Sequence, residues 1–158
     1  MPQRQLIRAV SEHLWYEVAM LRRCGHAILS TLPLGWVGHN AMVEAFALHC
    51  RNLINFFYDR PDPRYPDDVL AEHFLAKAET WHQVRPPKSE LLTLAEGRAN
   101  KQVSHLTYSR VGLTFDQKAW QIPTLLGEID GLLGLFLQKA DPELVVPAPP
   151  ETTDDKPA

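Results

Sequence analysis

The stretch that decides the fold runs from residue 119 to residue 136 and reads AWQIPTLLGEIDGLLGLF. Its apolar residues recur at alternating spacings of three and four: Ala119, Ile122, Leu126, Ile129, Leu133 and Phe136. This period places one apolar stripe along an α-helix, as in the helices of bundles. Thr114 and Gln117 have the spacing of a capping box, so we expect the helix to begin at Thr114 and to end near Lys139. Pro123 is expected to bend the helix or to delay its start.

Three further segments show helical periodicity, over about residues 4–30, 40–58 and 89–110. Asn40 is a plausible N-cap for the second segment, and Ser89 opens the third. In the first segment the expected core residues are Leu6, Val10, Leu14, Val18, Leu21 and Ile28. In the second they are Val43, Phe46, Cys50, Leu53 and Phe57. In the third they are Leu92, Ala95, Ala99, Val103 and Leu106.

The segment between the second and third helices is broken by prolines. Three of them lie between Asp59 and Pro66, which predicts a loop. After this loop we expect a short helix from Asp67 to about Leu75. Its first two residues are acids, and negative charge stabilises a helix N-terminus. No segment alternates as a strand would. The sequence therefore predicts an all-α fold, an antiparallel bundle of four long helices plus one short helix.

Length and composition predict one domain followed by a tail. The chain has 158 residues, 45% hydrophobic and 22% charged, which is an ordinary globular balance. Its apolar runs are too short to span a membrane, so we expect no membrane partner and a cytoplasmic location. Residues 1–140 are predicted to form the bundle. Residues 141–158 hold five prolines, five acids and one lysine, and we expect a disordered, Pro-rich, acidic tail.

Charge and cysteine usage narrow the function classes. Residues 1–140 hold 15 basic and 14 acidic side chains, so the body is nearly neutral and leaves room only for a local nucleic-acid site. Cys24 and Cys50 both lie among apolar neighbours in helical segments. We therefore expect two free, buried thiols rather than a disulfide or a metal-binding pair.

One polar stripe is expected on the third long helix. From Arg98 to Arg110 the sequence holds three cations and a histidine but no acid. Seven residues advance an α-helix by about 700°, so Arg98 and His105 point within about 20° of each other, roughly 10 Å apart along the axis. The stripe consists of Arg98, Lys101, His105 and Ser109, with Tyr108 at its edge. Leu91 and Leu94 extend it as a partly apolar face, which favours packing on a second copy of the chain.

These residue types suit the cleavage of RNA without a metal or other cofactor. Arginine binds a phosphate with its forked guanidinium and stabilises charge that develops in a transition state. Histidine titrates near neutral pH and can exchange a proton with the ribose 2′-hydroxyl or the leaving oxygen. Lys101, Tyr108 and Ser109 would then bind and position the substrate.

The stripe resembles the Arg-x(4–6)-His motif of the HEPN superfamily, all-α proteins that include many toxin and defence ribonucleases. Arg98 and His105 match that motif at its longest spacing, and Tyr108 lies near the place of a tyrosine in some members. Residues 47–57, ALHCRNLINFF, resemble the second helix of a bacterial HEPN-like subgroup of obscure function. The resemblance spans roughly residues 40–137. It implies a homodimer with Arg98 and His105 of both copies in a composite cleft, and RNA, an antitoxin or another protein as partner.

Less specific interpretations remain open at every position. Arg98 and His105 are alternatively a surface cation and a partly buried histidine in a non-catalytic, dimerising interaction module. Arg51 and Asn52 either line the same cleft as substrate-binding residues, or Arg51 pairs with an acid near Pro61. A metal-binding helical bundle is a further alternative, with His13, Glu17, Glu44 and His49 as candidate ligands. Their spacings do not match the metal motifs of helical bundles, so no metal is assigned.

Overall fold

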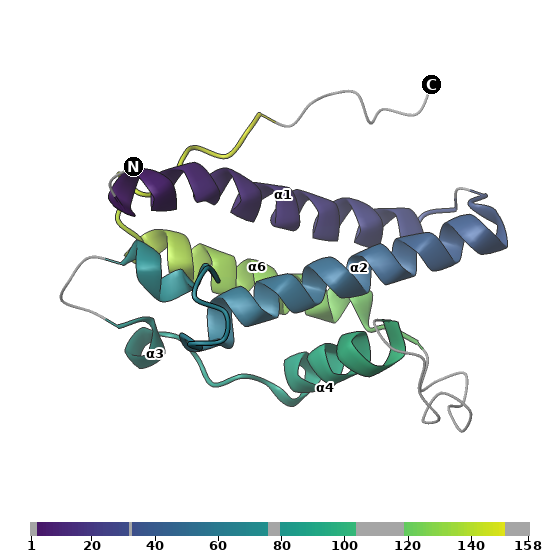
Figure 1. Cartoon of the computed structure of the whole chain (residues 1–158). Coiled ribbons are helices and arrows are strands. Elements are labelled where there is room, and N and C mark those ends of the chain that lie inside the picture. Colours follow the sequence, from purple (N-terminus) through teal and green to yellow (C-terminus); the bar gives the residue numbers. More distant parts are fainter. Residues whose placement is uncertain (1–2, 32, 76–79, 104–118, 151–158) are drawn as a thin grey trace.

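The computed structural model describes residues 3–31, 33–75, 80–103 and 119–150. Two long helices, α1 (Gln3–Leu29) and α2 (Gly35–Tyr58), form a hairpin. Figure 1 shows that they lie side by side, with α6 (Ile122–Lys139) packed against both and α4 (Glu90–Arg98) packed against α2. The shorter elements are the single 3-10 turn η1 (Ala71–Phe74), the one-turn helix α3 (Trp81–Val84) and the π-helical segment η2 (Ala99–Val103).

The all-α prediction is confirmed. Over the described ranges the structure contains no strand, and an isolated bridge between Leu75 and Ala140 is the sole β-type pairing. None of the described helices is both long enough and apolar enough to cross a membrane. The third long helix is predicted to extend to Arg110. The part of this helix after Val103 lies outside the described residues.

The core is built around an aromatic cluster at the end of α2. Its members are Phe56, Phe57, Phe74, Trp81 and Phe136. Neighbouring rings meet mostly edge to face, with centroids between 5.0 and 6.1 Å apart. This geometry lets the positive edge of one ring face the negative face of another. The indole N–H of Trp81 donates to the carbonyl oxygen of Phe57 at 2.6 Å, which satisfies the one polar atom of its side chain.

One predicted helix start is wrong, and another is delayed by a proline. The second helix begins at Gly35, not after Asn40, because Gly35 adopts a φ of +64° that turns the chain into the helix five residues earlier. Inside the helix, the side chain of Asn40 donates to the carbonyl oxygen of Trp36. Residues 119–121 are not helical, and α6 begins at Ile122 with Pro123 in its first turn, where a missing N–H costs no hydrogen bond. Pro123 therefore delays the helix, and the predicted start at Thr114 lies outside the described residues.

The short helix expected over Asp67 to Leu75 is reduced to one 3-10 turn. Successive turns close from Tyr65 N to Asp62 O and from Asp68 N to Tyr65 O, and Leu70 is extended. The chain enters helical geometry only at Ala71. Two predicted core residues are instead exposed: Leu6, with 53% of its surface exposed in the first turns of α1, and Ala119, just before α6.

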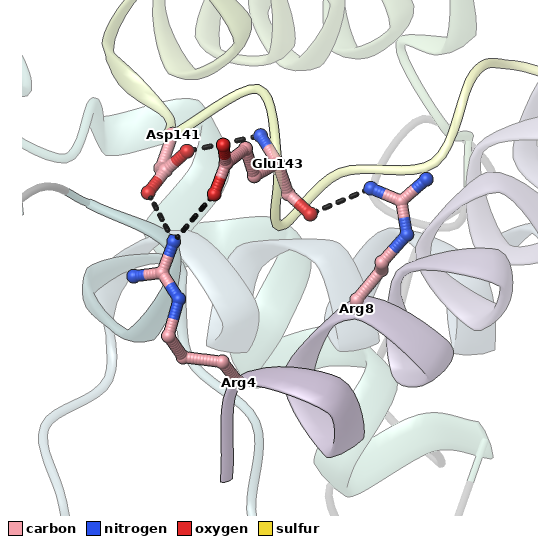
Figure 2. Close-up of polar contacts among 4 residues, drawn as sticks. All are labelled: Arg4, Arg8, Asp141 and Glu143. Carbon is pink, nitrogen blue, oxygen red and sulfur yellow. Dashed lines mark hydrogen bonds and ion pairs between the residues drawn. The ribbon is translucent and has the colours of Figure 1, made fainter. Parts of the chain in front are cut away.

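The tail was predicted to be disordered, but its first six residues pack against α1. We call residues 141–146 the C-terminal strap. Arg4 donates to the carboxylates of Asp141 at 2.8 Å and Glu143 at 3.2 Å, and Arg8 donates to the carbonyl oxygen of Glu143 (Figure 2). The strap is ordered because α1 supplies a polar partner for each of these groups.

Backbone groups and one leucine fasten the strap further along α1. The amide of Val146 donates to the hydroxyl of the buried Ser11 at 2.9 Å, and the indole of Trp15 donates to the carbonyl oxygen of Val146 at 2.8 Å. Leu144 is buried in the core cluster. Residues 151–158 of the predicted tail lie outside the described residues.

Candidate functional site

The helix that carries the predicted stripe begins where the sequence placed it. The hydroxyl of Ser89 accepts from the amide of Leu92 at 3.1 Å and donates to the carboxylate of Glu128 at 2.5 Å. It therefore caps α4 and ties it to α6. Leu92 and Ala95 are buried and turn one face of α4 to the core, as predicted.

Beyond α4 the backbone widens into the π-helical segment η2, whose first residue, Ala99, is buried. Arg98 and Asn100 flank Ala99 in the sequence. Because successive helical residues point about 100° apart, these two side chains leave the helix on opposite sides of its core face. Arg98, which belongs to the predicted stripe, and Asn100, which does not, therefore meet different parts of the protein.

Arg98 lies against the segment that leads into α6. It donates to the carbonyl oxygen of Ala119 at 2.8 Å, and its guanidinium carbon lies 4.5 Å from the ring centroid of Trp120. Burial lowers the pKa of this guanidinium below its ordinary value. A guanidinium stacked on an indole is attracted to the ring and held in one orientation. Arg98 is thus half-buried and anchored by its contacts.

The remaining stripe residues are only partly described. Lys101 lies in η2 and is exposed. His105, Tyr108 and Ser109 lie outside the described residues, and so does the predicted convergence of Arg98 and His105. The same holds for a composite cleft made by two copies.

Arg51 and Asn52 lie on the other side of α4. Arg51 donates to the side-chain oxygen of Asn100 at 3.2 Å, which joins α2 to η2. The amide of Asn52 donates to Glu17 at 3.1 Å. Both residues line a cleft of about 810 Å³, which we call the polar cleft. Its other lining residues include Asn55, Asp59, Arg60, Asp62, Tyr65, Asp68 and Asn100.

The structure brings Arg51 and Asn52 together but does not place Arg98 among the residues that line the polar cleft. The acid nearest Pro61 in sequence, Asp62, is paired with Arg64 at 2.6 Å. Sequence reasoning missed Asn100, Arg60, Tyr65 and the two aspartates Asp59 and Asp68. The concentration of charged residues in the proline-rich loop was the available signal, but it does not reveal that the loop folds back over α2.

Two of the candidate metal ligands of α1 and α2 make other contacts in the structure. Glu17 accepts from or pairs with His49 at 2.8 Å and also accepts from Asn52, so its carboxylate joins α1 to α2. His49 is buried and meets the ring of Tyr16 edge to face. Where the structure describes the chain, no three histidine, cysteine, aspartate or glutamate side chains gather in a group that could hold a metal ion.

Both cysteines are free and buried, as predicted. Burial raises the pKa of Cys24 above its ordinary value and raises that of Cys50 to about 12. Because the thiolate is the reactive form of cysteine, neither residue is set up as a nucleophile at neutral pH.

No protein-family model, curated protein or solved structure matches this chain. The residues and their surroundings are therefore the basis for assigning a function.

Proposed function

We propose that this chain is a HEPN-like, RNA-binding and metal-independent RNA-cleaving component of a cytoplasmic toxin or defence system. In this proposal the third long helix continues to residue 110 and completes a bundle of four long helices. Two copies pair along it, so that Arg98 and His105 of both copies share one groove.

The roles follow from the chemistry of the side chains. The 2′-hydroxyl of the RNA attacks the adjacent phosphorus, and His105 transfers the proton that this attack or the departure of the 5′-oxygen requires. Arg98 neutralises the charge that grows on the phosphate oxygens. Lys101, Tyr108 and Ser109 position the phosphate. The products are a 2′,3′-cyclic phosphate and a free 5′-hydroxyl.

The observation that supports this proposal is the anchoring of Arg98. Its guanidinium rests on Trp120 and donates to Ala119, so the side chain loses little freedom when it meets a phosphate. It lies at the start of a stretch that reaches Arg110 without an acid, so no carboxylate within that stretch competes for the cation.

The test is cleavage of a single-stranded RNA by the purified chain in the presence of EDTA. We expect products with cyclic phosphate ends, and we expect His105→Ala to slow cleavage by about 10²–10⁴-fold, as for loss of a general acid or base. His26→Ala, at an exposed histidine of α1, is the matched control and should leave the rate unchanged. Equal rates for the two variants would contradict the proposal.

A non-catalytic interaction module is the second candidate, and the contacts of Arg98 also favour it. The same hydrogen bond and stacking join α4 to the segment before α6, which is a structural task. If the chain is only an interaction module, Arg98→Ala should lower the melting temperature while no RNA is cleaved by either form. Retained stability together with lost cleavage would exclude this candidate.

A further inference from the structure

A smaller pocket opens beside the linker of residues 85–89, which joins α3 to α4 (Figure 1). Its volume is about 360 Å³, within the range of sites for small organic ligands. We call it the cationic pocket, and its lining residues are Tyr58, His82, Arg85, Pro86, Pro87 and Lys88. At neutral pH Arg85 and Lys88 are both cations. The described residues contribute no carboxylate to its lining.

One aromatic ring fixes where the two cations lie. The guanidinium carbon of Arg85 is 4.6 Å from the centroid of the Tyr58 ring, and the Nζ atom of Lys88 is 5.4 Å from the same centroid. The two charged groups therefore cannot be farther apart than these two distances taken together. Both are attracted to the electron-rich face of the ring, which offsets part of their mutual repulsion.

The backbone between the two cations is stiff. Pro86 and Pro87 separate Arg85 from Lys88, and each proline ring locks its own φ. The hydroxyl of Tyr58 lies 3.3 Å from the carbonyl oxygen of Pro86 and 3.4 Å from that of Pro87, so the ring is also held against the linker. A ligand that binds both cations thus meets side chains whose positions are already restricted, which lowers the entropy lost on binding.

Arg85 makes no ion pair with any residue that the structure describes. It donates to the carbonyl oxygen of Phe57, which is uncharged. The charges of Glu72 and Asp59 reach Arg85, but neither residue lines the pocket, and Glu72 pairs with His82 at 3.0 Å. Burial lowers the pKa of Arg85, so its charge is partly removed from water. An anion in the pocket would compensate that partly buried charge.

Two neighbouring cations suit a doubly charged anion. A phosphate monoester carries close to two negative charges at neutral pH. The forked guanidinium of Arg85 can bind two phosphoryl oxygens, and the ammonium group of Lys88 supplies a point charge. A carboxylate carries one charge and leaves one of the two cations unmatched. The prolines and the Tyr58 ring leave an apolar wall for the group that is esterified to the phosphate.

We propose that the cationic pocket binds a phosphate monoester, with the phosphoryl oxygens on Arg85 and Lys88 and the ester group beside Tyr58 and the two prolines. None of these residues is assigned to RNA cleavage, so the inference goes beyond the proposed function and does not depend on it. Two sources offer the same chemical group: a small organic phosphate, and the 5′-terminal phosphate of an RNA.

The experiment is an NMR titration of the full-length chain with phenyl phosphate, inorganic phosphate and benzoate. We expect phenyl phosphate to shift the amides of Arg85 and Lys88. Benzoate should bind about tenfold or more weakly, since one charge-assisted contact is lost, and inorganic phosphate should bind at the same place but more weakly than phenyl phosphate. Equal binding of phenyl phosphate and benzoate, or the absence of shifts at the linker, would overturn the proposal.

Two lysines supply the variant and its control. Lys88→Gln should weaken the binding of phenyl phosphate about tenfold. Lys139→Gln, at an exposed lysine of α6 that does not line the pocket, should leave binding unchanged. The same loss in both variants would show a general charge effect and would refute the site.

The partner of Lys88 separates direct contact from structural support. Glu96 pairs with Lys88 at 2.9 Å but does not line the pocket. Glu96→Gln leaves both cations in place and removes the carboxylate that competes for Lys88, so it should tighten the binding of phenyl phosphate. If the ion pair only maintains the local structure, Glu96→Gln should weaken binding as Lys88→Gln does, and that result would overturn the proposal.

Two oligouridines of equal length, one with a 5′-phosphate and one with a 5′-hydroxyl, separate the sources of the monoester. They are titrated into the His105→Ala chain, in which RNA cleavage is not expected. Tighter binding of the phosphorylated RNA than of phenyl phosphate identifies an RNA end as the source, and weaker binding identifies a small phosphate. Equal binding of the two RNAs at the linker would show recognition of backbone phosphates and would refute the monoester site.

Discussion

Gly25 lies where α1 packs closely on α2 and α6. A Cβ atom built on it would lie 3.0 Å from Leu126 Cδ1, 3.2 Å from Ile122 Cγ2 and 3.3 Å from Phe46 Cε2. Three neighbours on two helices would have to give way together. The absence of a side chain at this position therefore sets how tightly the three helices pack.

We predict opposite effects for two glycine-to-alanine changes. Gly131→Ala, in α6 with no atom within 4 Å of its new methyl group, should stabilise the chain by about 0.5–1 kcal/mol through helix propensity. Gly25→Ala gains the same propensity but meets the three contacts, and overpacking of a core costs about 1–3 kcal/mol. Urea denaturation should rank Gly131→Ala above the unmodified chain and Gly25→Ala below it. Equal gains would show that Leu126 simply moves aside.

Asp59 makes stability depend on pH in a defined direction. Burial and the charges of Glu96 and Asp68 raise its pKa in the folded chain, so its ionised form is disfavoured there. The folded state is penalised at pH values above the raised pKa, and the penalty disappears as pH falls below the pKa of the unfolded chain. Asp59→Asn should therefore raise the melting temperature at pH 7 and have no effect near pH 3. Asp67→Asn is the control, and an equal rise in that variant would contradict the role of burial and local repulsion at Asp59.

At the scale of elements, helix starts show what local sequence can and cannot predict. Ser89 was predictable because its capping bond to Leu92 lies within four residues. Asn40 is also a residue type that favours the N-cap position, but α2 begins five residues earlier, at Gly35. The positive φ of Gly35 cannot be predicted from the spacing of apolar residues. The stripe of α6 was predicted correctly from Ile122 onward, and Pro123 decided the start.

The C-terminal strap shows that local sequence can also fail to predict order. The strap belongs to residues 141–158, whose proline-rich and acidic composition favours disorder when that segment is considered alone. Its order depends on Arg4, Arg8, Ser11 and Trp15, which lie more than 130 residues earlier in the chain. No local rule connects residues at that separation.

We predict that Asp141 holds the strap on α1. The backbone amide of Glu143 and the side chain of Arg4 lower the pKa of Asp141, so its contribution to stability is present above the ordinary pKa of an aspartate and is lost as pH falls through the lowered value. Asp141→Asn should speed hydrogen exchange of the Val146 amide, which donates to Ser11. Glu143→Gln, at a more exposed carboxylate with a longer contact to Arg4, should speed it less. A larger effect at Glu143 would refute the role of Asp141.

At the scale of the whole molecule, the proposed homodimer makes a separate prediction. Leu94 lies on α4 next to the predicted stripe and is 56% exposed. Leu94→Glu should place a charge in the proposed interface and convert the dimer into a monomer, as measured by light scattering. Leu137→Glu, at an exposed leucine of α6, is the control and should leave the mass unchanged. A monomeric unmodified chain would contradict the proposed pairing.

The candidate site was predictable in its parts but not in its arrangement. Arg98, Arg51 and Asn52 were identified from residue type and helical position. The sequence did not indicate that Arg98 packs on Trp120 while Arg51 turns towards Asn100. Both contacts depend on how α2 and the segment before α6 pack against α4 and η2. Helical periodicity assigns a residue to a face, and only the packing of a neighbouring helix decides what that face meets.

The strap has a consequence for the order of folding. Its contacts with α1 close a loop of about the length of the whole chain, so they carry the largest loop-closure entropy in the fold. During synthesis Ser11 and Trp15 cannot make their hydrogen bonds to the strap until residue 146 has left the ribosome. The docking of the strap is therefore expected to be the last step that completes the surface of α1.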